Sequence, residues 1–171
     1  MNFLHVVYHY IIALVKLSLS SSKKSDIFHQ MNEKQKQPLD IAGSLIGTPY
    51  KYAALPETMP NFLDCSSFTQ HIYKQLGVDI LRSSIAQASV GNEIEDRKDL
   101  TIGDLIFFRS TKGHYNDEWF PGRNICIGHV AMFIGGDTVI HASGKNGKVA
   151  EENLDSVMTY EGPIVMIKRV I

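Results

Sequence analysis

The spacing of hydrophobic residues along the chain changes near residue 100, from the period of a helix to that of a strand. Before that point, Phe68, Ile72 and Leu76 recur at every fourth position and predict the apolar face of a helix over residues 64–76. After it, short apolar runs predict strands at 104–108, 128–134, 138–142 and 163–171. Helices followed by antiparallel strands indicate an α+β fold.

The predicted helices carry suitable residues at their ends. Asp64 is a good N-cap for the helix over 64–76, and Gly77 suits the position just after its last turn. Cys65 is therefore expected at the first position of this helix. An earlier helix is predicted over 38–46, because its proline suits a first turn and the glycine that follows suits a stop.

Residues 1–37 are predicted to form an N-terminal leader and linker, and residues 38–171 a single domain. Residues 2–15 lack Asp, Glu, Lys and Arg, but they are shorter than the roughly 20 residues that cross a bilayer as a helix. Their length matches the core of a signal peptide, although two histidines interrupt it. The segment is thus a candidate signal or anchor, which would make the protein secreted or bound to the cell envelope. The alternative is a start at Met31 and a cytoplasmic protein.

The composition is that of a globular domain, since 44% of the residues are hydrophobic and 20% are charged. The formal net charge is -1, from 17 basic and 18 acidic side chains. Nucleic-acid binding requires a clustered basic face, and this balance does not predict one. Membrane contact is expected only through the N-terminal segment.

Cys65 is a candidate nucleophile because of its predicted position. The thiolate is the reactive form of cysteine, and the positive end of a helix dipole lowers the pKa of a thiol. Unpaired backbone N–H groups at a helix start can also stabilise an oxyanion. The alternative is that Cys65 is a small buried core residue.

Two histidines could serve such a thiol, which needs a base and a group that orients the base. His129 and His141 lie on the predicted strands on either side of Gly135–Asp137. A three-residue turn pairs Ile134 with Thr138 and makes the two histidines diagonal neighbours on one face. A two-residue turn would place them on opposite faces, so the pairing requires an odd turn length or a compensating bulge. Taken singly, each is explained equally well as a core or surface histidine.

Five sequence strings in a fixed order carry a resemblance to a known family. They are Asp-Cys-Ser-Ser-Phe at 64–68, Leu-Arg-Ser-Ser at 81–84 with Gln87, Gly-Asp-Leu-Ile-Phe-Phe at 103–108, Gly-His-Val-Ala-Met-Phe-Ile-Gly at 128–135 and Val-Ile-His-Ala-Ser at 139–143. Together they strongly resemble the NlpC family of papain-like cell-wall cysteine peptidases, over roughly residues 39–171. The resemblance implies a papain-like α+β domain, in which the nucleophile helix packs on a mostly antiparallel sheet.

The resemblance also implies the site residues. Cys65 matches the nucleophile, His129 its base, and His141 the polar residue that orients the base. Four further residues match positions that border or bind the substrate, and these are Tyr52, Asp64, Arg82 and Ser83. In some members the acidic position pairs with the free amine of a stem peptide. Peptidoglycan stem peptides are thus the expected substrates, cut between γ-D-glutamate and a diamino acid, with no metal or cofactor.

Two departures from the family pattern concern the borders of the site. Ala53-Ala54 stand where the family usually has two glycines, which bears on the shape of the amine-binding side. The long loop 109–127 is expected to border the cleft, unless it is only a surface insertion.

Other functions stay open at this point. An amidase or acyltransferase of the same fold could act on another amide or ester. A zinc-binding or non-catalytic wall-binding module is the alternative from a different class, with Cys65, Cys126, His129 and His141 as a tetrahedral ligand set. A disulfide between the two cysteines would consume the proposed nucleophile.

Overall fold

The computed structural model describes the backbone of residues 33–114 and 118–171, and the side chains of residues 35–110 and 118–171. The predicted leader and most of the linker lie outside these residues. Within the described part, no helix combines the length and apolar character that crossing a membrane requires.

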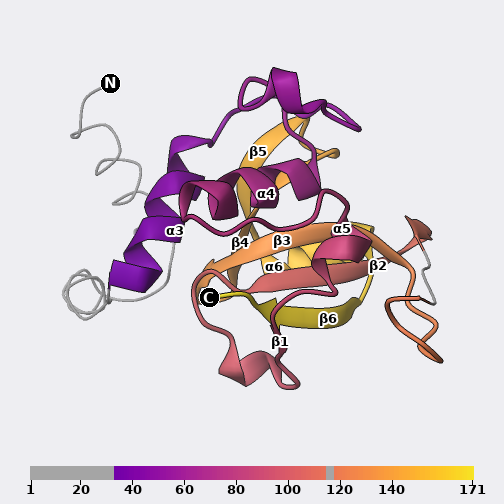
Figure 1. Ribbon diagram of the computed structural model, residues 1–171. Coiled ribbons are helices and arrows are strands. Elements are labelled where there is room, and N and C mark those ends of the chain that lie inside the picture. Colours follow the sequence, from indigo (N-terminus) through magenta and orange to yellow (C-terminus); the bar gives the residue numbers. More distant parts are fainter. Residues whose placement is uncertain (1–32, 115–117) are drawn as a thin grey trace.

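Four α-helices, two 3₁₀ helices and six strands make up the described chain (Figure 1). The helices are α3 (Glu33–Ser44), α4 (Cys65–Gln75), α5 (Ser84–Gln87) and α6 (Leu154–Glu161), with the 3₁₀ helices η1 (Pro56–Thr58) and η2 (Arg97–Asp99). The strands are β1 (Asn92–Glu93), β2 (Leu105–His114), β3 (Ile127–Gly135), β4 (Thr138–Ser143), β5 (Lys148–Asn153) and β6 (Ile164–Arg169). They form one antiparallel sheet in the order β1-β6-β2-β3-β4-β5, which confirms the predicted α+β class.

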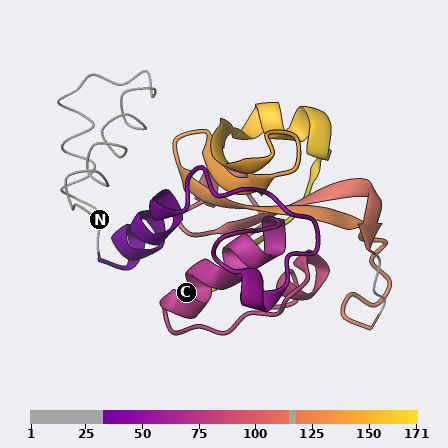
Figure 2. The same ribbon diagram turned by 90° about the horizontal axis from the view of Figure 1, so that it is seen from above.

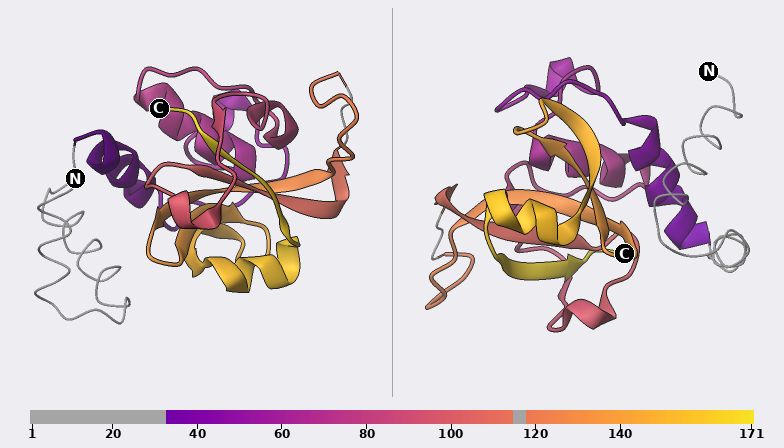
Figure 3. Two further views of the ribbon diagram at one scale, coloured as in Figure 1. Left: turned by 90° about the horizontal axis from the view of Figure 1, so that it is seen from below. Right: turned by 180° about the vertical axis from the view of Figure 1, so that it is seen from behind.

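Helices cover both faces of the sheet. The view from above places α4 on one side of the strands, and α6 on the other (Figure 2). Seen from behind, α6 lies across the face that α4 does not cover (Figure 3). The alternation of side chains along β2 accordingly feeds two hydrophobic clusters, with Phe107 on the α4 side and Phe108 on the α6 side.

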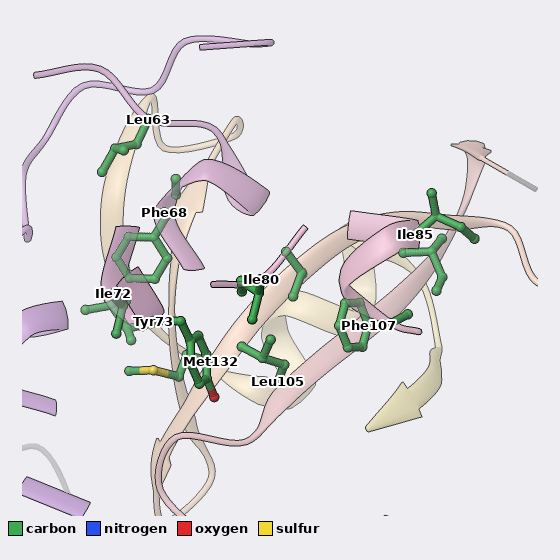
Figure 4. Close-up of a cluster of buried hydrophobic side chains, with 14 of the residues drawn as sticks. Leu63, Phe68, Ile72, Tyr73, Ile80, Ile85, Leu105, Phe107 and Met132 are labelled. Carbon is green, nitrogen blue, oxygen red and sulfur yellow. The ribbon is translucent and has the colours of Figure 1, made fainter. Parts of the chain in front are cut away.

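The larger cluster fixes α4 against the sheet. Phe68, Ile72 and Tyr73 of this helix pack with Phe107 and Met132 of the strands (Figure 4). All five side chains are almost wholly buried, and each such burial stabilises the fold by roughly 1.5–3 kcal/mol. The start of α4 is therefore held rigidly above the central strands.

Most predicted elements are confirmed, and the exceptions have physical reasons. The helix predicted to begin at Pro38 already includes Glu33 in the described chain, so Pro38 lies inside α3 rather than in its first turn. Strand β5 and helix α6 were not predicted. Only Val149 of β5 is buried, so the strand has no hydrophobic period to reveal it.

Candidate active site

A capping box places Cys65 at the first position of α4. The Asp64 carboxylate accepts a hydrogen bond from the Ser67 backbone N–H at 2.8 Å, and the Ser67 hydroxyl accepts one from the Asp64 N–H at 2.8 Å. Both bonds satisfy backbone groups that a helix start leaves unpaired. The sequence prediction for Cys65 and its N-cap is thus confirmed.

The surroundings of the Cys65 sulfur act against the helix dipole. The thiol is free and partly exposed, and the backbone N–H groups of Val130 and Ser66 favour its thiolate. Burial and the negative charges of Asp64 and Glu161 nevertheless raise the pKa of the thiol to about 12. The expectation that the helix start lowers this pKa was wrong, because desolvation and two nearby carboxylates outweigh it. Cys65 therefore needs a base to become a nucleophile.

The β3–β4 hairpin places the two histidines on the same face of the sheet, which required either an odd turn length or a compensating bulge. The turn has two residues, since Gly135 pairs with Thr138, and Ile134 forms a bulge. The bulge restores the register further along, where Met132 pairs with Ile140 and Phe133 with Val139. The predicted alternative of a compensating bulge is thus confirmed.

His129 and His141 form a buried, hydrogen-bonded pair. The His129 Nε2 lies 2.7 Å from the His141 Nδ1, and the rings meet edge to face at 82°. His129 is 4% exposed and His141 is fully buried. Burial, and to a smaller extent the charge of His141, holds the pKa of His129 well below its usual value. Both rings are therefore neutral near pH 7.

Two contacts connect the surroundings of His129 with Cys65. The backbone N–H of Val130, the next residue, lies against the Cys65 sulfur. Glu161 is close enough to Cys65 to raise its pKa, and its Oε1 lies 3.8 Å from the His129 Nδ1. Since Nε2 is engaged with His141, Nδ1 is the ring nitrogen of His129 left to act as a base. The fold thus brings Cys65, His129 and His141 into one site.

The predicted acid and arginine of the substrate side bind each other. The Asp64 Oδ1 accepts from the Arg82 Nη1 at 3.0 Å, and the Oδ2 from the Arg82 Nη2 at 2.6 Å. Burial opposes ionisation of Asp64, but the hydrogen bonds from Arg82 and Ser67 lower its pKa below the usual value. The role of Asp64 as acceptor of a substrate amine stays a prediction, and it requires Arg82 to release the carboxylate.

Ser83 and Tyr52 lie around the same region without such bonds to Cys65. Ser83 caps α5, with its hydroxyl accepting from the Ala86 N–H at 3.3 Å. Tyr52 is 77% exposed. Their substrate-binding roles stay predictions.

Tyr50 is a site residue that the sequence did not single out. Burial, followed by the charges of Cys65, Asp64 and Glu161, raises the pKa of its phenol to about 12, so the phenol interacts electrostatically with the surroundings of Cys65. Its ring packs against Gly144. In Pro-Tyr-Lys-Tyr, the family resemblance pointed to Tyr52 instead. Backbone bonding selects Tyr50, whose N–H donates to the Gly147 carbonyl at 2.8 Å.

The unpredicted segment β5–α6 supplies the remaining polar groups. The His141 Nε2 lies 3.0 Å from the Glu152 Oε2, and the Tyr160 hydroxyl donates to the same oxygen at 2.6 Å. Glu161 ends α6, and Gly162 follows it with a φ of 102°, where a side chain would meet the Arg109 carbonyl. No hydrophobic pattern could have found these residues, because their contribution is polar.

The described chain shows neither a cluster of metal ligands nor a disulfide, the two features on which the zinc-binding and disulfide alternatives depended. Across residues 35–110 and 118–171, no three His, Cys, Asp or Glu side chains gather as metal ligands. Cys65 and Cys126 are both free thiols. Part of the loop 109–127 is also more than a surface insertion, since Phe120 and Ile125 are buried in the larger cluster.

Comparisons with known proteins agree with this geometry. A family model described as the NlpC/P60 family matches residues 47–166. A Corynebacterium glutamicum protein named probable endopeptidase is 35% identical over 68% of this chain and 47% of its own length. A Bacillus cereus protein named gamma-D-glutamyl-L-lysine dipeptidyl-peptidase is 36% identical over 61% of this chain and 29% of its own length. The chain thus spans about half, or less, of these relatives.

Among solved structures, the NlpC/p60 domain of the peptidoglycan hydrolase SagA has a TM-score of 0.60 at 27% identity. The match covers 81% of this chain and 99% of that domain. The described fold therefore corresponds to one whole domain of this kind.

Proposed function

The chain belongs to the NlpC/P60 family, as its sequence strings predicted, and from that premise we propose that it is a cysteine peptidase that hydrolyses peptidoglycan stem peptides. The observation that carries the proposal is the buried His129–His141 pair beside a thiol at a helix start. A purely structural role for the histidines would not explain the free thiol in the same site, and a purely structural role for the cysteine would not explain the paired imidazoles. The presence of both groups in one site supports nucleophilic catalysis.

The pKa directions favour a particular form of that catalysis. The thiol pKa is raised and the imidazole pKa is lowered, so both groups rest in their neutral forms. Cys65 then attacks the amide carbonyl as His129 takes the thiol proton, and His129 passes that proton to the leaving amine. Water, activated by His129, hydrolyses the acyl-enzyme. The Tyr50 hydroxyl, whose pKa the charge of Cys65 helps to raise, is the proposed donor to the oxyanion.

The bond cut is proposed to be that between γ-D-glutamate and a diamino acid. The name of the Bacillus cereus relative supports this bond, since it specifies γ-D-glutamyl-L-lysine. An amidase or acyltransferase acting on another substrate with the same dyad is an alternative outcome of the test.

Mass spectrometry of muropeptides incubated with the protein tests the proposal. The expected product of a stem tripeptide is the free diamino acid, with the γ-glutamyl fragment as the other half. Cys65→Ala and His129→Ala should each lower turnover by at least about 10³-fold, because a nucleophile–base pair acts as a unit. Circular dichroism should show the native fold in both variants.

Cys126→Ala is the matched control, since Cys126 is the other free thiol. It should retain wild-type turnover. Hydrolysis by Cys65→Ala at the wild-type rate would overturn the assignment of the nucleophile. Cleavage of acylated lipids but not of muropeptides by the wild type would replace the proposed substrate with the alternative.

A further inference from the structure

We infer that Glu152 is a positioning residue of this active site, which sets the tautomer of His129 by way of His141. Its effect on turnover rests on the proposed function, whereas its effect on the two rings does not. The inference starts from hydrogen bonds that continue the histidine pair away from the cysteine.

His141 is bonded on both sides of its ring. Its Nδ1 lies 2.7 Å from the His129 Nε2, and its Nε2 lies 3.0 Å from the Glu152 Oε2. The pairing of β4 with β5 explains the second contact. His141 lies opposite Ala150 and Glu152 opposite Val139, so the two side chains are diagonal neighbours on one face of the sheet.

The proton positions follow from the chemistry of the carboxylate. An ionised carboxylate only accepts hydrogen bonds, so the His141 Nε2 must carry a proton. Burial holds the pKa of His141 below its usual value despite the opposing effect of Glu152, so the ring is neutral and its Nδ1 is an acceptor. The His129 Nε2 must then donate to it. The lone pair of His129 is left on Nδ1, which under the proposed function is the nitrogen that accepts the thiol proton of Cys65.

Other groups around Glu152 keep it ionised and in place. The Asn146 Nδ2 and the Tyr160 hydroxyl each donate to the same Oε2 at 2.6 Å. Lys145 stands over the Tyr160 ring at 4.1 Å, and its charge also favours the carboxylate. Although burial opposes ionisation, these contacts and His141 lower the pKa of Glu152. Glu161 is the nearby group of like charge, and its own pKa is raised in part by Glu152.

A purely structural role is the competing explanation. Glu152 also ties the β4–β5 turn, through Asn146, to helix α6, through Tyr160. Such a tie would affect stability but would not determine which nitrogen of His129 carries a proton. The tautomer therefore separates the two roles.

The first measurement is made on the wild-type protein and needs no variant. The ¹⁵N chemical shifts of the imidazole nitrogens should show His129 protonated at Nε2 and unprotonated at Nδ1 at pH 7. His141 should likewise be protonated at Nε2. A wild-type His129 protonated at Nδ1 would overturn the inference, whatever the enzyme hydrolyses.

Two substitutions then test the carboxylate. Glu152→Leu removes the acceptor, so His129 should populate both tautomers and kcat should fall about 10²-fold with KM little changed. Glu152→Gln should restore most of the activity, because three donors converge on Oε2 and select the amide oxygen for that position. A Glu152→Leu protein with wild-type kcat and wild-type imidazole shifts would contradict the inference.

Glu151→Leu is the matched control, since Glu151 lies on the same strand opposite Ile140 and points to the other face. It should keep wild-type turnover. Alkylation of Cys65 by iodoacetamide adds a readout that is independent of substrate, and its rate at pH 7 should fall in Glu152→Leu only. If the wild type cleaves no muropeptide, the proposed function fails, whereas the alkylation rates and ring shifts still decide the role of Glu152.

Discussion

Two carboxylates flank Cys65, and the fold surrounds them in opposite ways. Asp64, one residue before the cysteine, accepts five hydrogen bonds, two of them from Arg82. Glu161, almost a hundred positions away, has the neutral His129 ring at 3.8 Å and no Lys or Arg partner among the described residues. The pKa of Asp64 is accordingly lowered, whereas burial and the charge of Glu152 raise that of Glu161.

The difference distinguishes Asp64, a structural acid whose carboxylate is fully hydrogen-bonded, from Glu161, whose carboxylate has no cationic partner within the described part of the chain. The lone pairs of Asp64 are engaged, and its side chain holds the start of α4 and the segment around Ala54 in place. Glu161 is only 21% exposed, yet no Lys or Arg neutralises it in the described chain. Proximity to Cys65 in the sequence therefore does not decide which of the two acids has a charged partner.

The largest expected effect comes from breaking the Asp64–Arg82 pair. Arg82→Met leaves a buried charge without its partner and should lower the free energy of unfolding by about 3 kcal/mol. Urea denaturation measures the change. Arg97→Met is the control, since Arg97 is similarly exposed but pairs with the exposed Asp155, and it should cost below about 1 kcal/mol. Equal losses in both variants would show that Asp64 is not the structural acid.

A smaller effect is expected at Tyr50, whose hydroxyl lies near both carboxylates. Tyr50→Phe removes a donor beside the nucleophile and should lower kcat about 10-fold with KM nearly unchanged. Steady-state kinetics on a muropeptide measures this loss. Tyr52→Phe should have the smaller effect on kcat, because Tyr52 is 77% exposed. The reverse order would assign the oxyanion side to Tyr52.

The smallest effect concerns the dependence of stability on pH. The pKa of Glu161 is raised in the folded chain, so its contribution is full below the unfolded pKa and is lost as pH rises through the folded pKa. Glu161→Gln should therefore gain stability over the wild type as pH increases from about 4. Asp64→Asn should show the opposite sign, because a lowered pKa stabilises the fold above that pH and is lost below it. Urea midpoints at pH 4 and pH 8 test both, and parallel curves for wild type and Glu161→Gln would refute the contrast.

The sequence predicted those parts of the fold that have a hydrophobic period or a local cap. The apolar face of α4, its N-cap at Asp64 and the central strands fall in this class. The register of the hairpin could also be stated in advance as a condition, and the bulge at Ile134 meets it. Cys65 and both histidines could therefore be placed on their elements before the structure was known.

The rest depends on contacts between segments that are distant along the chain. Glu152 and Glu161 reach the site through β5, where only Val149 is buried, and through the short helix α6. The pKa of Cys65 depends on burial and on Glu161, so the helix start alone predicted the wrong direction. Polar geometry of this kind leaves no periodic trace in a sequence.

The bulge in the β3–β4 hairpin also limits how this domain can change during evolution or engineering. Because one extra residue keeps His129 and His141 on the same face, deleting it without lengthening the turn would rotate His141 away from its partner. Insertions or deletions of an even number of residues in the hairpin should keep His129 and His141 on the same face and hydrogen-bonded. Loop grafts at this corner should therefore be designed in steps of two residues, whereas the loop at 109–127 carries no such restriction from the histidine pair.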